Sequence, residues 1–205
     1  MIRRSSYALA CAVLALTGEA AGAGTCLTAD IMNPSGQRVS SPYGVDRTGR
    51  AGASAGYHQG MDIVNSEGAG TKIFSGSPGS VSYHNFKGGG VIADVISGDT
   101  RFLYLHMNTT TLPNGSSGQV AAGDQVGTMG CKGMGSCAPH LHLGTLLKGS
   151  VVAATGTNGR VWRMGSGKGA SPMTADAIKA ALPQAWYYVN PEPFLPRQIP
   201  ISNKY

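Results

Sequence analysis

The sequence predicts a mainly β protein built on an antiparallel β-sheet, with one helix near the C-terminal end. Its 205 residues include 31 glycines, which are spread along the chain as turns between short β-branched or aromatic runs. This distribution is typical of many short strands. Two of the runs, 91–96 and 101–106, flank Ser97-Gly98-Asp99-Thr100, a favourable hairpin turn. The length predicts one domain with a sizeable core.

The strands are predicted from apolar or alternating runs that end at glycine, proline or small polar residues. In chain order they cover residues 61–64, 72–74, 80–84, 91–96, 101–106, 125–129 and 140–147. The short turn between the fourth and fifth runs makes that pair antiparallel, and we expect the same of the whole sheet.

The predicted helix lies in the alanine-rich run 174–182, which stops before Pro183. Ser171 is the expected N-cap and Pro172 suits the first helical position. We expect this helix to pack on the outside of the sheet. Before it, residues 149–169 are polar and glycine-rich, and Thr157-Asn158-Gly159 predicts a small hairpin turn.

Residues 1–23 predict a cleavable export signal. Arg3 and Arg4 form a basic start, an apolar run covers residues 7–16, and Ala21-Gly22-Ala23 supplies the small residues of a cleavage site. The apolar run is shorter than the ~20 residues that span a bilayer. We therefore expect a periplasmic or secreted protein, with no stable membrane insertion after the signal is removed.

An oxidising compartment favours disulfide bonds. Cys131 and Cys137 enclose the flexible sequence Lys-Gly-Met-Gly-Ser, and we predict that they pair. Closing so short a loop contributes only ~2 kcal/mol in the chain-entropy model, so its main effect is on local shape. Cys26 is left over as a free, capped or intermolecularly paired thiol.

The formal charge of +6 is compatible with an anionic wall or membrane surface but is weak support for either. The basic residues form no stripe, so no nucleic-acid partner is predicted.

Four of the five histidines and one aspartate lie in three short motifs: HxxxD (His58, Asp62), Tyr-Leu-His (His106) and HxH (His140, His142). Side chains two residues apart share a face on a strand but not on a helix, so HxH predicts an extended segment. The leucines on either side of His142 would then face the core, while both imidazoles face a common site.

His58, Asp62 and His142 together offer two neutral imidazoles and one carboxylate. This set suits one Zn²⁺ ion and leaves its fourth position for water, as in catalytic zinc sites. His106, expected on the same strand face as Tyr104, and His140 can both approach that water without binding the metal. One is expected to take its proton, and the other to donate a hydrogen bond to the tetrahedral intermediate.

In this order the motifs resemble those of the lysostaphin-type zinc endopeptidases of bacterial cell walls, over residues 56–144. The resemblance implies an antiparallel β fold with the site in an open groove, and peptidoglycan as the substrate. It implies that the metal ligands are His58, Asp62 and His142, and that His106 and His140 are the catalytic pair. The zinc endopeptidase core would then cover residues 57–147, between an N-terminal segment, 24–56, and a C-terminal extension, 148–205, with the helix and a closing segment.

Two departures from the family pattern border the groove: Leu143-Gly144 after HxH and the segment from Cys131 to Cys137. A third is the long connection over residues 148–185, which could cover or extend the groove. They leave the substrate preference open. Two other functions also stay open. A non-catalytic wall-binding or regulatory module would be expected to lose one of the five motif residues, and a secreted protease would use the same chemistry on glycine-rich proteins.

Overall fold

The computed structural model describes residues 25–49, 56–86, 90–133, 138–155, 160–166, 170–179 and 182–202. The strands are β1 (Gln37–Ser41), β2 (Asp46–Arg47), β3 (Gly56–Tyr57), β4 (Met61–Asn65), β5 (Lys72–Phe74), β6 (Gly79–Phe86), β7 (Gly90–Ser97), β8 (Thr100–Thr110), β9 (Ser117–Val120), β10 (Gln125–Met129), β11 (Leu141–Lys148), β12 (Trp162–Arg163) and β13 (Trp186–Val189). The helices within these ranges are α2 (Gly149–Thr155), α3 (Ala175–Lys179) and the 3₁₀ turn η2 (Glu192–Phe194).

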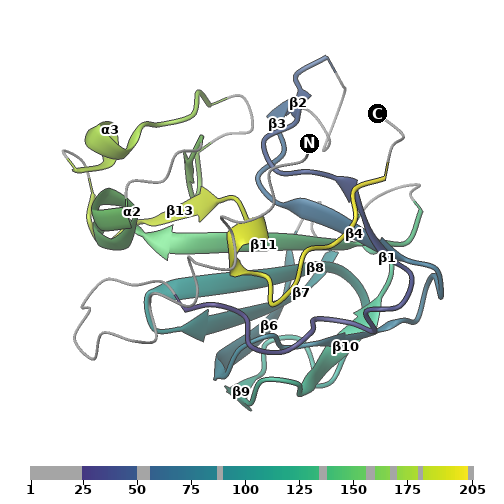
Figure 1. The fold of residues 1–205 in the computed structure, drawn as a ribbon. Coiled ribbons are helices and arrows are strands. Elements are labelled where there is room, and N and C mark those ends of the chain that lie inside the picture. The colour runs from purple at the N-terminus through teal and green to yellow at the C-terminus, as the bar shows by residue number, and fades with distance from the viewer. Residues whose placement is uncertain are drawn as a thin grey trace.

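One large sheet organises the molecule (Figure 1). Its strands follow the order β1-β4-β11-β8-β7-β6-β9, with β10 joining β5 to β8, and β13 joining β12 to β11. All these strand pairs are antiparallel. The predicted fold class, a mainly β protein with an antiparallel sheet, is therefore confirmed.

Each of the seven predicted strands is present, with ends that differ by a few residues at most. The largest difference is β8, which continues past His106 to Thr110. The predicted hairpin is also present, because Ser97 of β7 pairs with Thr100 of β8 across a two-residue turn. Gly98 has a φ of 58° there, the left-handed conformation that such turns require and glycine readily adopts.

The C-terminal helix forms, but it begins later than predicted. Helix α3 covers Ala175–Lys179, and its N-cap is Thr174, whose hydroxyl accepts a hydrogen bond from the Ala177 amide at 3.3 Å. The prediction that Ser171 caps it and that Pro172 opens it is wrong. Helix α2 was not predicted, and the hairpin expected at residues 157–159 lies outside the described residues.

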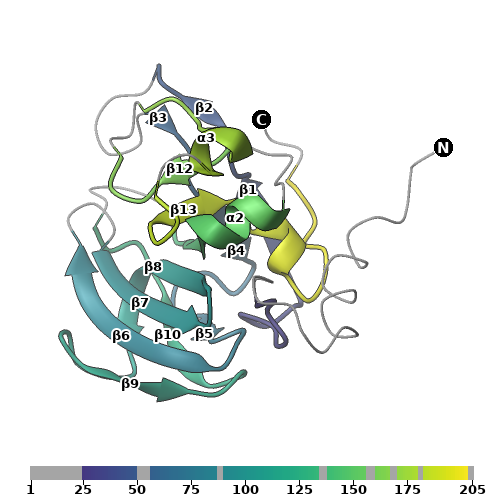
Figure 2. The same ribbon diagram turned by 90° about the vertical axis from the view of Figure 1, so that its left-hand side faces the viewer.

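The segment from α2 to β13 has a small core of its own, formed by residues of β11, α2, α3 and β13 and by Val161. Figure 2 shows α2 and α3 side by side over β13, at one end of the main sheet. Because β13 pairs with β11 and β1 pairs with β4, both the N-terminal and the C-terminal segments contribute strands to the sheet that carries the motifs.

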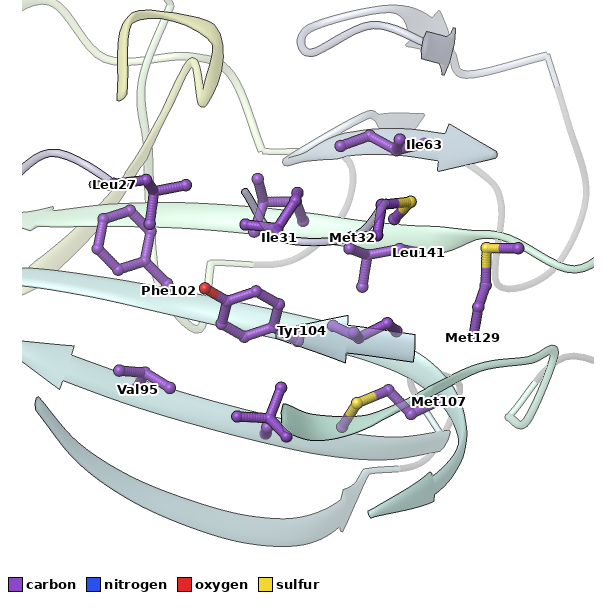
Figure 3. Packing of buried hydrophobic residues seen from close by; sticks show 14 of the residues in the cluster. Leu27, Ile31, Met32, Ile63, Val95, Phe102, Tyr104, Met107, Met129 and Leu141 are labelled. Atoms are coloured by element: carbon purple, nitrogen blue, oxygen red, sulfur yellow. The ribbon is translucent and has the colours of Figure 1, made fainter. Parts of the chain in front are cut away.

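Figure 3 shows the main core. Its members Ile63 and Leu141 are neighbours in sequence of the motif residues Asp62 and His142, and successive side chains of a strand project from opposite faces, so the core lies on the face opposite these two residues. Leu27, Ile31 and Met32 from the N-terminal segment pack there against sheet residues such as Phe102 and Leu141. The N-terminal segment is thus part of the fold rather than an appended tail, since removing it would expose the largest apolar cluster.

No described helix is long and apolar enough to cross a membrane.

None of the cysteines that the structure describes is free, so the free-thiol alternative for Cys26 is wrong. The pairing of Cys131 with Cys137 stays a prediction, because Cys137 lies outside the described residues. The predicted export signal, residues 1–23, lies outside them as well.

Candidate metal centre

Two of the proposed ligands are brought together by strand pairing. Strand β11 alternates as the sequence predicts, so that Leu141 and Leu143 are completely buried in the core while His142 projects from the opposite face. His142 pairs directly with Asp62 of the neighbouring strand β4. Directly paired residues project from the same side of a sheet, and the distance from His142 Nδ1 to Asp62 Oδ1 is 3.0 Å.

His58 completes a compact triangle from the loop between β3 and β4. Its Nε2 lies 3.0 Å from Asp62 Oδ1 and 3.1 Å from His142 Nδ1. Three ligand atoms from two imidazoles and one carboxylate therefore face a common point. The three residues form a group whose ligand atoms all lie within 4.8 Å of one another.

The orientation of the His58 ring is set by the backbone. Its Nδ1 lies 2.7 Å from the carbonyl oxygen of Pro42. Because a carbonyl oxygen can only accept a hydrogen bond, Nδ1 carries the hydrogen, and the lone pair of Nε2 faces the triangle. Backbone hydrogen bonds between His58 and its neighbours Gly44 and Val45, at 2.8 and 3.0 Å, hold the same loop in place.

Gly60, between the two residues of the HxxxD motif, makes room for His142. A Cβ atom at this position would lie 2.7 Å from His142 Cε1 and 2.8 Å from the carbonyl oxygen of Leu143. Glycine is therefore required in the middle of the motif because the His142 ring and the backbone of β11 approach it too closely for a side chain.

His106 reaches the site through a β-bulge. The register of β8 against β7 shifts by one residue between the pairs Tyr104–Ala93 and Met107–Val91, and His106 has a φ of 65°. This left-handed conformation costs a non-glycine residue about 1–2 kcal/mol. It turns the His106 ring to the motif face, where the ring centroid lies 4.9 Å from that of His140 and 5.9 Å from that of His142.

The expectation that Tyr104 and His106 share a face is consequently wrong. Tyr104 is fully buried in the main core, and its hydroxyl accepts a hydrogen bond from the Gly76 amide at 3.0 Å. Without the bulge, the alternation of β8 would send His106 into that core as well.

His140 and His106 are oriented alike. Nδ1 of His140 lies 2.9 Å from the carbonyl oxygen of Ala138, and Nδ1 of His106 lies 3.1 Å from that of Lys132. Both Nδ1 atoms therefore donate to backbone, which leaves each Nε2 with its lone pair. Nε2 of His140 lies 3.8 Å from Asp62 Oδ1.

The environment favours the neutral form of His106 and His142 and the charged form of Asp62. Burial, reinforced by the neighbouring His142 and His140, lowers the pKa of His106 to about 4. Burial also lowers the pKa of His142. Burial alone would raise the pKa of Asp62, but its contacts with His142 and His58 outweigh that effect and hold the pKa well below its usual value. Neutral imidazoles and an ionised carboxylate are the forms that bind metal.

One polar contact of the site was not predicted from the sequence. Arg47 of strand β2 donates to Asp62 Oδ2 at 2.8 Å. A lone arginine 15 residues before its partner has no local pattern that marks it, and the contact arises because β2 folds back beside β3.

The sequence model of peptidase family M23 matches residues 56–154, the part of the chain that holds all five motif residues. These residues belong to peptidase family M23. The lysostaphin-type family that the motifs resemble is thereby confirmed. No curated protein matches the chain.

Several solved structures are similar to part of the chain. Csd3 from Helicobacter pylori is 29% identical, with 60% of this chain aligned to 30% of that one at a TM-score of 0.44. The catalytic domain of lysostaphin from Staphylococcus simulans is 26% identical over 54% of this chain and 79% of its own, at 0.42. A mutant catalytic domain of the prophage-encoded M23 protein EnpA from Enterococcus faecalis is 22% identical over 73% and 95%, at 0.46. The chain thus spans less than a third of Csd3.

The M23 domain has a donor set that fits zinc. Family M23 is zinc-dependent, and the triangle supplies two imidazole nitrogens and one carboxylate oxygen, with His58 and Asp62 buried and His142 partly buried. This set matches the His₂-carboxylate ligation of catalytic zinc in peptidases. With three protein ligands the site also leaves one position of a tetrahedral ion for water or substrate.

Proposed function

We propose that the protein is a zinc-dependent endopeptidase that cleaves peptide bonds in the stems or cross-bridges of peptidoglycan. In this proposal His58, Asp62 and His142 hold one Zn²⁺ ion, and His106 and His140 are the catalytic pair. The observation that carries it is the ligand triangle, with atom separations of 3.0 to 3.1 Å and two further imidazoles beside it. Peptidases of family M23 act on peptidoglycan.

His58, Asp62 and His142 would hold the zinc ion, which when bound would activate water and polarise the carbonyl of the bond to be cleaved. The protein contributes proton transfer and charge stabilisation. His106 and His140 donate through Nδ1 to fixed backbone carbonyls, so their Nε2 atoms are held towards the site. A neutral Nε2 accepts a proton from the attacking water, and a protonated one donates a hydrogen bond to the developing oxyanion.

The rigidity of this pair supports a catalytic role. The bulge that turns His106 towards the site places a non-glycine residue in the left-handed region. Strain of this kind persists only where surrounding structure enforces it, and it is concentrated at functional sites. A purely structural β8 would avoid it.

We further propose that the protein acts in the periplasm or outside the cell, where it would meet its substrate. Support comes from residues 1–23, which have the sequence pattern of a cleavable export signal.

Digestion of purified peptidoglycan tests the proposal. The protein is incubated with the wall material, with and without a zinc chelator, and new amino termini are identified by mass spectrometry. We expect new peptide ends that disappear with chelator and with His142→Ala but persist with His84→Ala, the matched control on β6. Casein and a glycine-rich protein serve as alternative substrates.

If only casein or the glycine-rich protein is cleaved, the substrate of the enzyme is a protein and not peptidoglycan. A folded, zinc-loaded protein that cleaves none of them would refute the enzymatic proposal and favour a wall-binding role, since some M23 domains are inactive.

A further inference from the structure

A short segment before the M23 match surrounds two of the three proposed ligands. Residues 41–47 lie upstream of residue 56, where the match begins. The Pro42 carbonyl accepts from His58 Nδ1 at 2.7 Å, the Gly44 amide donates to the carbonyl of His58 at 2.8 Å, and the amide of His58 donates to Val45 at 3.0 Å. This segment therefore acts on the metal site from outside the matched region.

The last residue of the segment, Arg47, contacts Asp62. Its guanidinium donates to Asp62 Oδ2 at 2.8 Å and to the hydroxyl of Ser41. Both partners of the ion pair are largely removed from solvent, with side-chain exposures of 13% for Arg47 and 12% for Asp62. A pair this buried keeps its geometry much better than a surface pair does.

The two oxygens of Asp62 thus have different partners. Oδ1 faces the triangle, 3.0 Å from both His58 Nε2 and His142 Nδ1. Oδ2 faces Arg47 on the other side. A carboxylate divided in this way presents a single oxygen to an ion in the triangle.

The placement of Arg47 is not explained by its own hydrogen bonding. Nε of Arg47 is buried and has no hydrogen-bond partner among the described residues. Burying an unsatisfied donor is unfavourable, so the guanidinium is placed where it serves Asp62 rather than where all its donors are paired.

We propose that Arg47 is a positioning residue that restricts Asp62 to one-oxygen coordination and thereby keeps a metal position open for water or substrate. The inference rests on the metal site of the proposed function. Without Arg47, Oδ2 is free to turn towards the ion and take up that position. Partners that orient ligating groups are worth about 10–100-fold in metal affinity or activity.

Zinc affinity and cobalt absorption test this role without any peptidase assay. The variants are Arg47→Met, which removes the donors, and Arg47→Lys, which keeps the charge but replaces the planar fork by a single ammonium. Arg101→Met is the matched control, because it removes a similarly buried pair with Asp94, in which Arg101 Nε lies 2.8 Å from Asp94 Oδ1. Thermal unfolding of each variant identifies losses that come from stability alone.

For Arg47→Met we expect zinc affinity, measured by competition with a chelator, to fall by about 10–100-fold. The visible absorption of Co²⁺ bound in place of zinc should weaken, as it does when a four-coordinate ion becomes five-coordinate. Arg47→Lys should lie between Arg47→Met and the unaltered protein, and Arg101→Met should leave both measurements unchanged.

An Arg47→Met protein that is folded and binds zinc as tightly as the unaltered protein, with the same cobalt spectrum, would overturn the proposal. So would tighter zinc binding with an unchanged cobalt spectrum, which would mean that Arg47 acts on the ion by charge repulsion and not by positioning Asp62. If the unaltered protein binds no zinc, the metal site itself fails. If it binds zinc but cleaves no wall, the role of Arg47 is still tested by these two measurements.

Discussion

Replacing Gly60 by alanine is expected to disable the metal site while the sheet stays folded. The added Cβ would lie 2.7 Å from His142 Cε1, whereas carbon atoms in contact are normally about 3.5–4.0 Å apart. The imidazole must therefore retreat by roughly 0.8–1.3 Å, which is the difference between these distances. The carbonyl oxygen of Leu143, at 2.8 Å, belongs to paired backbone and cannot yield as easily.

A shift of this size exceeds what the site tolerates. Functional groups must be held within about 0.5 Å of their working geometry, and metal–ligand distances within about 0.2 Å. A misplacement of 1 Å costs on the order of 100-fold in activity. Overpacking should lower the free energy of unfolding by about 1–3 kcal/mol.

Three measurements examine Gly60→Ala: zinc affinity by chelator competition, peptidoglycan cleavage, and urea unfolding in the presence of chelator. Gly49→Ala is the matched control, because a Cβ at Gly49 has no neighbour within 4 Å among the described residues. We expect Gly60→Ala to lose at least about 100-fold in cleavage and to bind zinc more weakly. Zinc affinity and cleavage equal to those of Gly49→Ala would show that His142 does not need this space and would refute the reasoning.

Three other outcomes are expected. His106→Ala should lose about 100–10,000-fold in cleavage with unchanged zinc affinity, because His106 approaches the site without joining the ligand triangle; a loss of zinc would contradict its catalytic role. Zinc at 1,000 times its dissociation constant should stabilise the protein by about 4 kcal/mol in calorimetry, and no such gain should appear with His142→Ala. Thr174→Ala should lower the free energy of unfolding by about 1 kcal/mol in urea titration, through loss of the α3 cap, whereas Ser171→Ala should have no effect.

The parts of the fold that were predictable from sequence are those in which side chains alternate over several residues. At the start of β11 histidines and leucines alternate over residues 140–143, so the core side and the site side follow there directly from the order of residues. The hairpin between β7 and β8 was equally predictable, since the glycine at the turn and the β-branched runs on both sides each indicate a tight β-hairpin.

The bulge at His106 has no such signature. Regular alternation along β8 would place the side chains of His106 and Tyr104 on the same face of the sheet. The extra residue of the bulge turns the His106 side chain to the opposite face. A histidine in the left-handed conformation is unfavourable by itself. It forms because tertiary contacts hold it, among them the hydrogen bond to Lys132, and a sequence window around His106 does not contain Lys132.

Helix α2 was missed for a related reason. Its sequence, Gly-Ser-Val-Val-Ala-Ala-Thr, is rich in residues of low helix propensity. Val151 and Val152 are fully buried in the small core with Leu147 and Tyr187. Short helices are stabilised mainly by such packing rather than by propensity, so the helix depends in part on β13, a strand that is distant in the sequence.

The three proposed ligands are held by two different kinds of structure, and they should respond differently to substitution. Asp62 and His142 are paired residues of adjacent strands, so the spacing of the sheet sets their separation. His58 is positioned by a loop and by hydrogen bonds from residues 42–45. Changes in the N-terminal segment should therefore alter zinc affinity by degrees, whereas changes that disturb the β4–β11 pair should abolish zinc binding together with the fold.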